Sequence, residues 1–562
     1  MLNKDVKVKI PSSRIKTVPK GKDGPCYIYY VDRYYYDKEK KYSNDKRIII
    51  GKKIDDEYMI PNDNFLKYFP EKAVELISDA PDIFSDTLHV GVMSVIDKIM
   101  TDTGVGTLLD STYDDKSQLI KDIISYMIVE ESSKYEDFPY FEREHNTFTS
   151  RVYSDSTVSD LLKNEISPVK IKFFLDSWNK INSDIEDVYI NVDATNINVT
   201  NEFEGLGEYG KAKDDESLPQ VNITYMSKAI DNTPLNYSLY HGSVNDAAEF
   251  KFIINDINRY GYKNVGFIMD RIYYSKDTYE RLIKEGYSIL CALKENLDFV
   301  KNVYNECSIK LKEMVTCYIG EHEVSGITKK VKLNESGKKN VYGYVHMFYS
   351  DKTASLEREA ILQCVYEYEK SLRKLLDENK DLSEADLKKY SKWFRFKTEP
   401  STKAVYDFVK KTSVIEEELK KCGYFALLSS KKMETKDALD IYKQRDGVEK
   451  LFRTLKTSMD FDHVGVHSRK SLEAKVFITF VASIVRNEIF KATRKLDLKL
   501  RKTYTVPVTV KELETIEATR NSDNTYYRRY VLTAKQKKLL SLFGLSETNI
   551  DESISKFNRN RK

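Results

Sequence analysis

The segment from Tyr442 to Lys456 carries the side chains best suited to chemistry in this sequence. If the segment is helical, at roughly 100° per residue, its polar groups fall within about 80° of one another, beside an apolar stripe that can pack into a core. A carboxylate can hold a divalent metal, while guanidinium, ammonium and phenol groups suit phosphate oxygens. The pattern predicts metal-dependent chemistry on a phosphate backbone, at a face formed by Tyr442, Arg445, Glu449, Arg453 and Lys456.

Two further carboxylates follow short strand-like runs. Residues 188–192 alternate as a strand that we expect to end at Asp193, and the apolar run 264–269 leads to Asp270. Carboxylates at the ends of neighbouring strands can meet at one edge of a sheet, and a helix across that edge can add Glu449. Three such groups suit a pair of Mg²⁺ ions about 4 Å apart.

Each of these acids also has a simpler interpretation. An aspartate at a strand end is a common turn residue, and a glutamate on a helix is usually solvated. Their order in an α/β pattern, together with the cations around Glu449, favours a shared site.

The periodicity of the chain changes several times, which predicts a multidomain α/β protein. Helical periodicity before the α/β region includes Ser154–Lys163, which could be the second helix of a DNA-binding helix-turn-helix or an ordinary packing helix. The expected regions are a β-rich N-terminal module (1–80), a helical region (81–186), an α/β domain that carries the three acids (187–293 and 424–490), an insertion domain (294–423) and a basic C-terminal region (491–562).

Composition narrows the class of protein. The 562 residues exceed one compact core, and 41% hydrophobic with 32% charged residues is typical of a soluble globular chain. The net charge of +3 is nearly neutral, but residues 491–562 hold seventeen Lys and Arg against eight Asp and Glu, which fits either polyanion binding or a solvated helical tail.

The cysteines and apolar runs predict where the protein works. Six scattered cysteines without a C-x-x-C pair favour a reducing compartment over a zinc ribbon or a disulfide framework. The basic N-terminus has no apolar signal segment, and the run 476–485 is about half the length that spans a bilayer. We therefore expect a buried helix at 476–485 and no membrane partner.

The combined pattern resembles a known family. The spacing Tyr442-x2-Arg445-x3-Glu449-x6-Lys456 is similar to the Y-R-E-K signature of DDE transposases from bacterial insertion sequences. The contexts Asp193-Ala-Thr and Asp270-Arg resemble the regions of the two catalytic aspartates in that family. Similarity is clear over about 187–293 and 424–490 and weaker elsewhere.

The resemblance implies a fold and a set of roles. The fold would be a ribonuclease-H-like catalytic domain at 187–293 and 424–490, interrupted by a large insertion between the second Asp and the Glu. The helical region 81–186 would bind the DNA ends. The partners would be double-stranded DNA, as terminal inverted repeats and target, and a second copy of the chain in a synaptic homodimer. The cell compartment would be the bacterial cytoplasm, and Mg²⁺, with Mn²⁺ able to substitute, would be the cofactor. The implied metal ligands are Asp193, Asp270 and Glu449, and the implied DNA contacts are Tyr442, Arg445 and Lys456.

Some residues depart from that pattern or stand beside it. Arg453 shares the helical face but is not part of the signature, so it ranks below the other cations. Ile272 and Asp446 replace residues that the family often has, and Gly447 inside a helix costs roughly 1 kcal/mol relative to Ala. Trp393 could stack on an extruded DNA base or serve as an aromatic anchor of the insertion.

The resemblance leaves two other functions open. A domesticated DNA-binding protein could keep the fold without cleavage, although the intact Asp, Asp, Glu set argues against it. A stand-alone nuclease of the same fold would cut DNA without joining the 3′-hydroxyl to a target.

Overall fold

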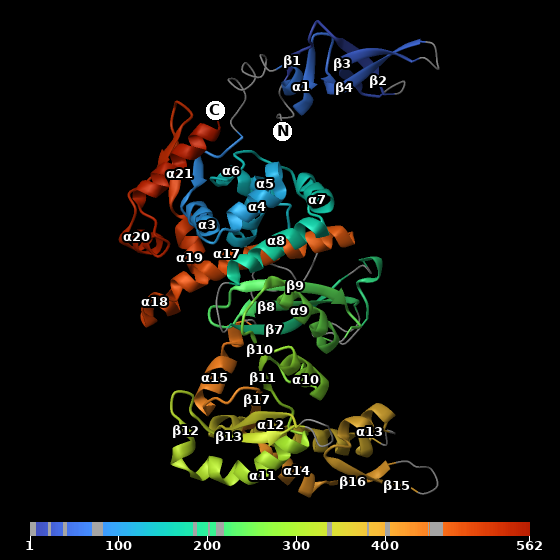
Figure 1. Ribbon diagram of the computed structural model, residues 1–562. Coiled ribbons are helices and arrows are strands. Elements are labelled where there is room, and N and C mark those ends of the chain that lie inside the picture. Colours follow the sequence, from blue (N-terminus) through green and yellow to red (C-terminus); the bar gives the residue numbers. More distant parts are fainter. Residues whose placement is uncertain are drawn as a thin grey trace. The chain divides into compact units, whose positions relative to one another are not determined.

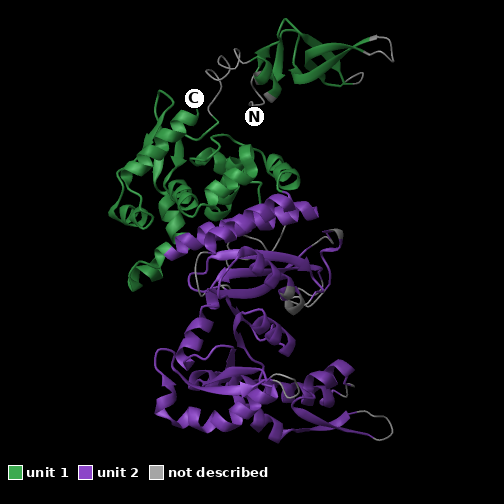
Figure 2. Cartoon of the chain, in the orientation of Figure 1, with its two compact units in different colours: residues 1–166, 492–562 green, residues 167–491 purple. Residues whose placement is uncertain are grey.

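The computed structural model divides the chain into two compact units (Figure 2). Unit 1 comprises residues 1–166 and 492–562, and unit 2 comprises residues 167–491. The structure describes residues 7–20, 24–37, 42–69, 83–183, 188–199, 203–209, 218–244, 246–333, 340–378, 382–399, 405–447, 449 and 465–561.

The N-terminal module of unit 1 is a five-stranded antiparallel sheet (Figure 1). Its strand order is β1-β5-β4-β3-β2, and Ile28, Ile50, Met59 and Phe65 pack into a small core beneath it. The alternation of apolar and polar residues that predicted strands over 26–60 therefore reflects one buried sheet face. The elements are β1 (Val8–Lys9), β2 (Ile15–Pro19), β3 (Cys26–Asp37), β4 (Tyr42–Lys53), β5 (Tyr58–Pro61) and α1 (Asp63–Tyr68).

The remainder of unit 1 is helical and combines segments from both ends of the chain. The sequence predicts separate regions at 81–186 and 491–562, whereas the structure joins 83–166 to 492–561 through the sheet β19-β18-β6 and through contacts of α19 with α3 and α5. Gly91 is required at this junction, because a Cβ there would lie 2.4 Å from the carbonyl oxygen of Leu513.

Nearly all of α5 is buried, which makes it the central helix of this half. The elements are β6 (Thr87–His89), α3 (Gly91–Asp102), α4 (Val105–Tyr113), η1 (Asp114–Lys116), α5 (Ser117–Val129), α6 (Phe138–Glu144), α7 (Asp155–Asn164), α18 (Leu498–Thr503), α19 (Val506–Glu514), β18 (Glu517–Arg520), β19 (Tyr526–Arg528), α20 (Ala534–Ser541) and α21 (Glu547–Asn560).

Unit 2 is built on a nine-stranded mixed sheet in the order β12-β13-β14-β17-β11-β10-β7-β8-β9. Strand β10 is parallel to both β7 and β11, and the other pairs are antiparallel. The strands are β7 (Tyr189–Asn198), β8 (Gln220–Lys228), β9 (Pro234–His241), β10 (Gly266–Met269), β11 (Ser288–Ala292), β12 (Tyr318–Ile319), β13 (Val324–Lys332), β14 (Tyr342–Tyr349) and β17 (Tyr424–Ser429).

The expected insertion domain at 294–423 is only partly separate. Strands β12, β13 and β14 extend the central sheet, because β14 pairs along six residues with β17. The part that forms its own core is 351–421, where Leu372, Trp393, Phe394 and Phe408 pack together. The insertion domain was expected because the sequence pattern changes after Glu295. That change did not indicate that β12, β13 and β14 return to the same sheet.

Helices cover the sheet on its faces. Phe480 of α17 packs on Tyr225 and Tyr237 of β8 and β9, and Phe477 meets Phe174 of α8. The run 476–485 is buried within α17, as expected from the sequence. The remaining elements are α8 (Pro168–Asn182), η2 (Phe203–Gly205), α9 (Asp246–Tyr260), α10 (Lys276–Lys284), α11 (Asp298–Glu313), η3 (Val315–Cys317), α12 (Asp351–Asp377), α13 (Glu384–Tyr390), β15 (Phe394–Thr398), β16 (Val405–Lys410), α14 (Thr412–Lys421), α15 (Thr435–Lys443) and α17 (Arg469–Thr493).

In the ranges that the structure describes, no helix is long and apolar enough to cross a membrane.

Candidate active site

The pairing of β7 with β10 places two aspartates side by side. Val192 is the register partner of Met269 in this parallel pair, so Asp193 and Asp270 are the next residues on adjacent chains. Parallel strands direct the same register positions toward the same edge, which explains why the two acids meet.

Strand β7 does not end at Asp193 as the sequence suggested. It continues to Asn198, and Asp193 itself pairs with Tyr225 of β8. The polar run after Asp193 resembles a turn in the sequence, but Asn196 is buried and its amide donates to the Gln220 side-chain oxygen. A polar partner on β8 thus allows the strand to continue through polar residues.

The two aspartates use their oxygens in the same way. Oδ1 of Asp193 accepts the backbone N–H of Ala194 at 3.0 Å, and Oδ1 of Asp270 accepts that of Arg271 at 2.6 Å. Each Oδ2 then faces the guanidinium of Arg445. The backbone bonds hold both carboxylates in one orientation toward a common point.

The segment that carries Arg445 and Glu449 is not the continuous helix that the sequence predicted. Helix α15 ends at Lys443, Gln444 and Arg445 form a turn, and Asp446, Gly447 and Glu449 are helical again. This break brings Arg445 under the sheet edge while Glu449 remains near the surface.

Two contacts with other segments of unit 2 explain the break in this helix. The side-chain amide of Asn191 on β7 donates to the carbonyl oxygen of Gln444 at 3.3 Å. An added Cβ at Gly447 would lie 1.7 Å from the side-chain oxygen of Asn232, so any larger residue would have to displace the Asn232 side chain. Asn191 is the residue that sequence reasoning missed here. Its only local signal is its position two residues before Asp193, on the same side of the strand.

Arg445 brings the three carboxylates together. Its Nη2 lies 3.3 Å from Asp193 Oδ2, 3.7 Å from Asp270 Oδ2 and 3.2 Å from Glu449 Oε1. Since all three contact one nitrogen, no two of these oxygens are more than about 7 Å apart. The three acids named from the sequence therefore lie at one site.

The site is partly enclosed and remains acidic. The side chains of Arg445 and Asp193 are 14% and 15% exposed, whereas Glu449 is 54% exposed. Burial lowers the pKa of the Arg445 guanidinium, but the three carboxylates, Asp193 foremost, raise it above its ordinary value overall. One positive charge faces three negative ones, so the cluster retains an affinity for additional cations.

Tyr442 supports Arg445 from the end of α15. Arg445 Nη1 lies 3.5 Å from the Tyr442 hydroxyl oxygen, which accepts, and the ring packs beside Ala438 and Leu439. Burial raises the pKa of the Tyr442 phenol, although the Arg445 charge acts in the opposite direction. Tyr442 is thus a neutral residue that helps to orient the guanidinium.

Of the remaining residues named from the sequence, only Trp393 lies within the described part of the chain, and it does not join this cluster. Arg453 and Lys456 lie outside the described residues. Trp393 is only 6% exposed and packs in the core of the 351–421 segment, with Lys392 over its ring. A buried indole cannot stack on a DNA base without leaving this core, so its position agrees with the alternative role of an aromatic anchor.

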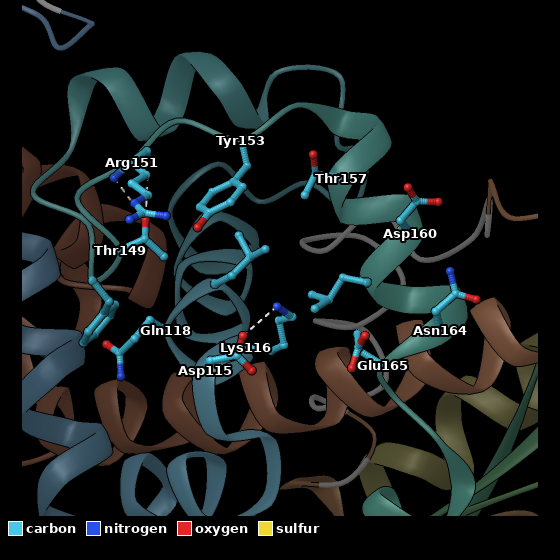
Figure 3. Close-up of a pocket in the computed structure, with 13 residues that line it drawn as sticks. Asp115, Lys116, Gln118, Thr149, Arg151, Tyr153, Thr157, Asp160, Asn164 and Glu165 are labelled. Atoms are coloured by element: carbon cyan, nitrogen blue, oxygen red, sulfur yellow. Dashed lines mark hydrogen bonds and ion pairs between the residues drawn. The ribbon is translucent and has the colours of Figure 1, made fainter. Parts of the chain in front are cut away.

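Unit 1 contains a cavity of about 630 Å³ beside α7, the helix considered above for DNA recognition (Figure 3). Its lining carries charges of both signs, with Lys116 paired to Asp115. Charges of both signs in this lining do not single out phosphate as a ligand, so the helix-turn-helix interpretation of α7 stays a prediction. The other charged residues of the lining are Arg151, Asp160 and Glu165.

Comparisons with known proteins point to one family. A family model described as "Transposase DDE domain" matches residues 186–485, more than half of the chain. Among solved structures, a piggyBac transposase in a synaptic complex with hairpin DNA matches with 11% identity and a TM-score of 0.30, over 82% of this chain and 76% of that chain. No curated protein sequence matches.

Proposed function

The chain belongs to the family of transposases with a DDE domain, and on that premise we propose that it cuts the ends of its own insertion sequence and joins the 3′-hydroxyl to target DNA. The observation that carries the proposal is the convergence of Asp193, Asp270 and Glu449 on one nitrogen of Arg445. We further assign the chain to the bacterial Y-R-E-K group, on the spacing of Tyr442, Arg445, Glu449 and Lys456.

The donor set fits divalent metal ions. Three carboxylates with one guanidinium leave an excess of negative charge, and hard oxygen donors with open positions suit Mg²⁺, with Mn²⁺ able to replace it. Asp193, Asp270 and Glu449 would hold the ions. When bound, such ions activate the attacking water or hydroxyl and stabilise the leaving oxygen of an in-line phosphoryl displacement.

The residues of the chain prepare this site before substrate arrives. Asp193 and Asp270 are oriented by the backbone N–H groups that follow them, so their second oxygens already face the common point. Arg445 offsets part of their mutual repulsion and is held by the sheet edge and by Tyr442. This preorganisation lowers the energy needed to bring the carboxylates together.

The cations of the segment would contact the DNA backbone. Arg445 presents a planar set of donors that matches phosphate oxygens, and Lys456 would add a point charge. We rank Arg453 below both, because the signature does not include it. Double-stranded DNA is the partner proposed for these residues, and pairing of two transposon ends would require a homodimer.

A strand-transfer assay tests the proposal and separates it from its alternatives. The substrate is a labelled terminal fragment taken from matched inverted repeats that flank the gene, incubated with Mg²⁺ and a target plasmid. A transposase cuts the fragment and joins it to the plasmid, whereas a nuclease of the same fold only cuts it. A domesticated DNA-binding protein shifts the fragment on a gel and does neither, and that result would overturn the proposal.

A further inference from the structure

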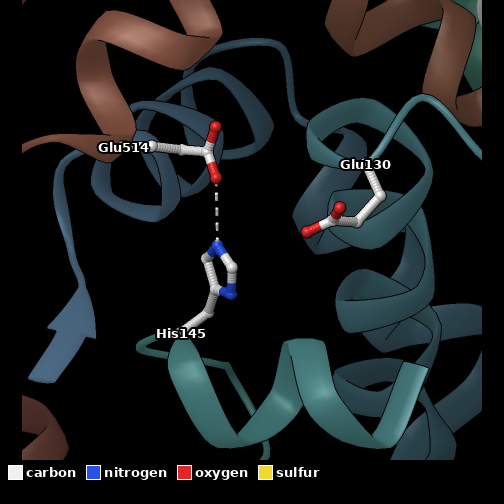
Figure 4. A group of neighbouring side chains, drawn as sticks. All are labelled: Glu130, His145 and Glu514. Atoms are coloured by element: carbon white, nitrogen blue, oxygen red, sulfur yellow. Dashed lines mark ion pairs between the residues drawn. The ribbon is translucent and has the colours of Figure 1, made fainter. Parts of the chain in front are cut away.

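Unit 1 contains a second group of potential metal ligands, far from the first in sequence. Glu130 follows the last turn of α5, His145 follows α6, and Glu514 is the last residue of α19. One ligand atom from each lies within 4.8 Å of the others. Figure 4 shows the three side chains directed toward one another from three different segments.

The hydrogen bonding of His145 determines which of its nitrogens faces the carboxylates. Nδ1 lies 2.9 Å from the carbonyl oxygen of Phe141, and because a carbonyl only accepts, Nδ1 carries a proton. In the neutral ring Nε2 therefore presents a lone pair toward the two acids. The residue is 2% exposed, and Nε2 has no hydrogen-bond partner in the part of the chain that the structure describes.

This arrangement is unfavourable without a cation. While the ring is neutral, a buried acceptor that faces two carboxylates leaves three electron-rich groups together, so either a proton on Nε2 or a bound metal ion must lie between them. The nearest contact of Nε2 is Oε1 of Glu514 at 3.6 Å, which is too long for a good hydrogen bond. A bound metal would supply the missing partner for all three groups.

The histidine ring is held rigidly in this orientation. Phe141 stacks on it with ring centroids 4.0 Å apart, and His89 lies on it at 4.9 Å. His89 also contacts the carbonyl oxygen of Glu514 through Nδ1 at 2.8 Å, which fixes the end of α19. A histidine whose second nitrogen bonds a backbone carbonyl is the usual arrangement of a metal ligand.

We propose that Glu130, His145 and Glu514 bind one divalent transition-metal ion, with Zn²⁺ the best fit, and that this ion clamps the N-terminal helices of unit 1 to its C-terminal segment. Imidazole nitrogen and carboxylate oxygen are both zinc ligands, three protein ligands leave a fourth position open, and imidazole suits Zn²⁺ better than Mg²⁺. Bonds of 2.0–2.2 Å place tetrahedral ligands about 3.4 Å apart, close to the 3.6 Å between Nε2 and Oε1.

The site differs from the proposed catalytic one in its chemistry and its place. It lies entirely within unit 1, whereas Asp193, Asp270 and Glu449 belong to unit 2. Glu514 comes several hundred residues after Glu130 and His145, so the ion would connect two distant segments of the chain, and its expected role is to stabilise the fold rather than to contact DNA.

Zinc content of the full chain tests the proposal. The protein is stripped with a chelator and titrated with Zn²⁺ against a chromophoric competitor, in an Asp193→Asn, Glu449→Gln background that removes the other acidic site. We expect one tightly bound zinc. Glu130→Gln and Glu514→Gln should each weaken it by about 100-fold or more. The control Glu144→Gln changes an exposed residue next to His145 and should bind as the background does.

Two further readouts keep the test independent of folding defects. Saturating Zn²⁺ should raise the thermal midpoint of the background protein by about 5 °C and leave that of Glu514→Gln unchanged. Co²⁺ in place of Zn²⁺ should give a tetrahedral d–d absorption spectrum that Glu514→Gln loses. If the background protein binds no zinc, or if Glu130→Gln, Glu514→Gln and Glu144→Gln bind it equally well, the proposal is wrong.

Discussion

In unit 2 three carboxylates surround one guanidinium, whereas in unit 1 two carboxylates surround Nε2 of a histidine. When that imidazole ring is neutral, its proton is on Nδ1 and Nε2 carries none. The first group lies along a sheet edge, and Glu449 at its rim is 54% exposed. The second group is gathered from helix ends around a histidine that is 2% exposed, with Glu514 half-buried and Glu130 exposed at its edge. An accessible, partly neutralised cluster suits exchangeable ions and a substrate, while a cluster around a buried ligand suits a permanent ion.

A third way to neutralise acids occurs within unit 1, next to the histidine group. Glu142 is fully buried and accepts the backbone N–H of Tyr153, while Asp122 accepts those of Phe148 and Thr149. Burial raises the pKa of Glu142 to about 9 and that of Asp122 to about 7. Here the proton itself removes the charge, so these acids contribute to stability and its pH dependence.

The largest effect should come from the sheet-edge acids. Asp193→Asn, Asp270→Asn or Glu449→Gln should each lower the rate of strand cleavage by roughly 10³-fold or more, because a lost metal ligand removes several kcal/mol of transition-state stabilisation. Binding of the terminal fragment should survive in a gel-shift assay. Asp446→Asn, on an exposed neighbour of the same segment, is the matched control and should cut normally.

The proton-neutralised acid makes a prediction about stability. Because the pKa of Glu142 is higher in the folded chain than its ordinary value of 4.5, its contribution is present at low pH and is lost as the pH rises toward about 9. The free energy of unfolding should therefore fall by on the order of 1 kcal/mol per pH unit between about pH 5 and pH 8.

Glu142→Gln should flatten that dependence, since an amide does not titrate. Thermal unfolding followed by circular dichroism across this pH range measures it, with the exposed Glu144→Gln as the control. Equal slopes for both variants and the unmodified chain would show that Glu142 is already ionised in the fold.

Arg445 distinguishes the sheet-edge acids from the histidine group, because it places a guanidinium among the three carboxylates. In Arg445→Gln the carboxylates lose their positive neighbour, so the Mg²⁺ concentration that gives half-maximal cleavage should fall about tenfold. The maximal rate should fall as well, by about 100-fold, because a phosphate contact and the preorganisation are lost. A variant that needs more Mg²⁺ than the unmodified chain would contradict this electrostatic account.

The smallest effect concerns Lys456, which is proposed to act through phosphate alone. Lys456→Ala should weaken binding of the terminal fragment by about tenfold. The slope of log binding constant against log salt concentration should become shallower by about 1. Lys436→Ala, an exposed lysine paired with Glu321, should leave the slope unchanged. Fluorescence anisotropy at several salt concentrations would separate the two, and identical slopes would remove Lys456 from the DNA contacts.

The sequence predicted the meeting of Asp193, Asp270 and Glu449 because the information is local. Short apolar runs indicate the two strands, and the residues that follow parallel strands in register share an edge. The signature spacing then supplied Glu449 and Arg445 as a unit, and the structure brings all of these side chains together.

Long-range contacts explain what the sequence did not show. The break at Gln444 depends on Asn191, more than 250 residues earlier, and on the close approach of Asn232 to Gly447. The pairing of β14 with β17 likewise connects segments on either side of a separate core. The histidine group combines Glu130 and Glu514, and no periodicity within either segment indicates the other.

The most direct test of the central claim replaces one carboxylate with a thiolate. Mg²⁺ binds a soft thiolate poorly, whereas Mn²⁺ accepts softer ligands, so a side chain in contact with the ion changes the metal preference of the reaction. Asp270→Cys should lose cleavage in Mg²⁺ and recover a measurable part of it in Mn²⁺, while Asp270→Ser recovers none. Equal activity of Asp270→Cys in the two metals, relative to the unmodified chain, would show that Asp270 does not hold the catalytic ion.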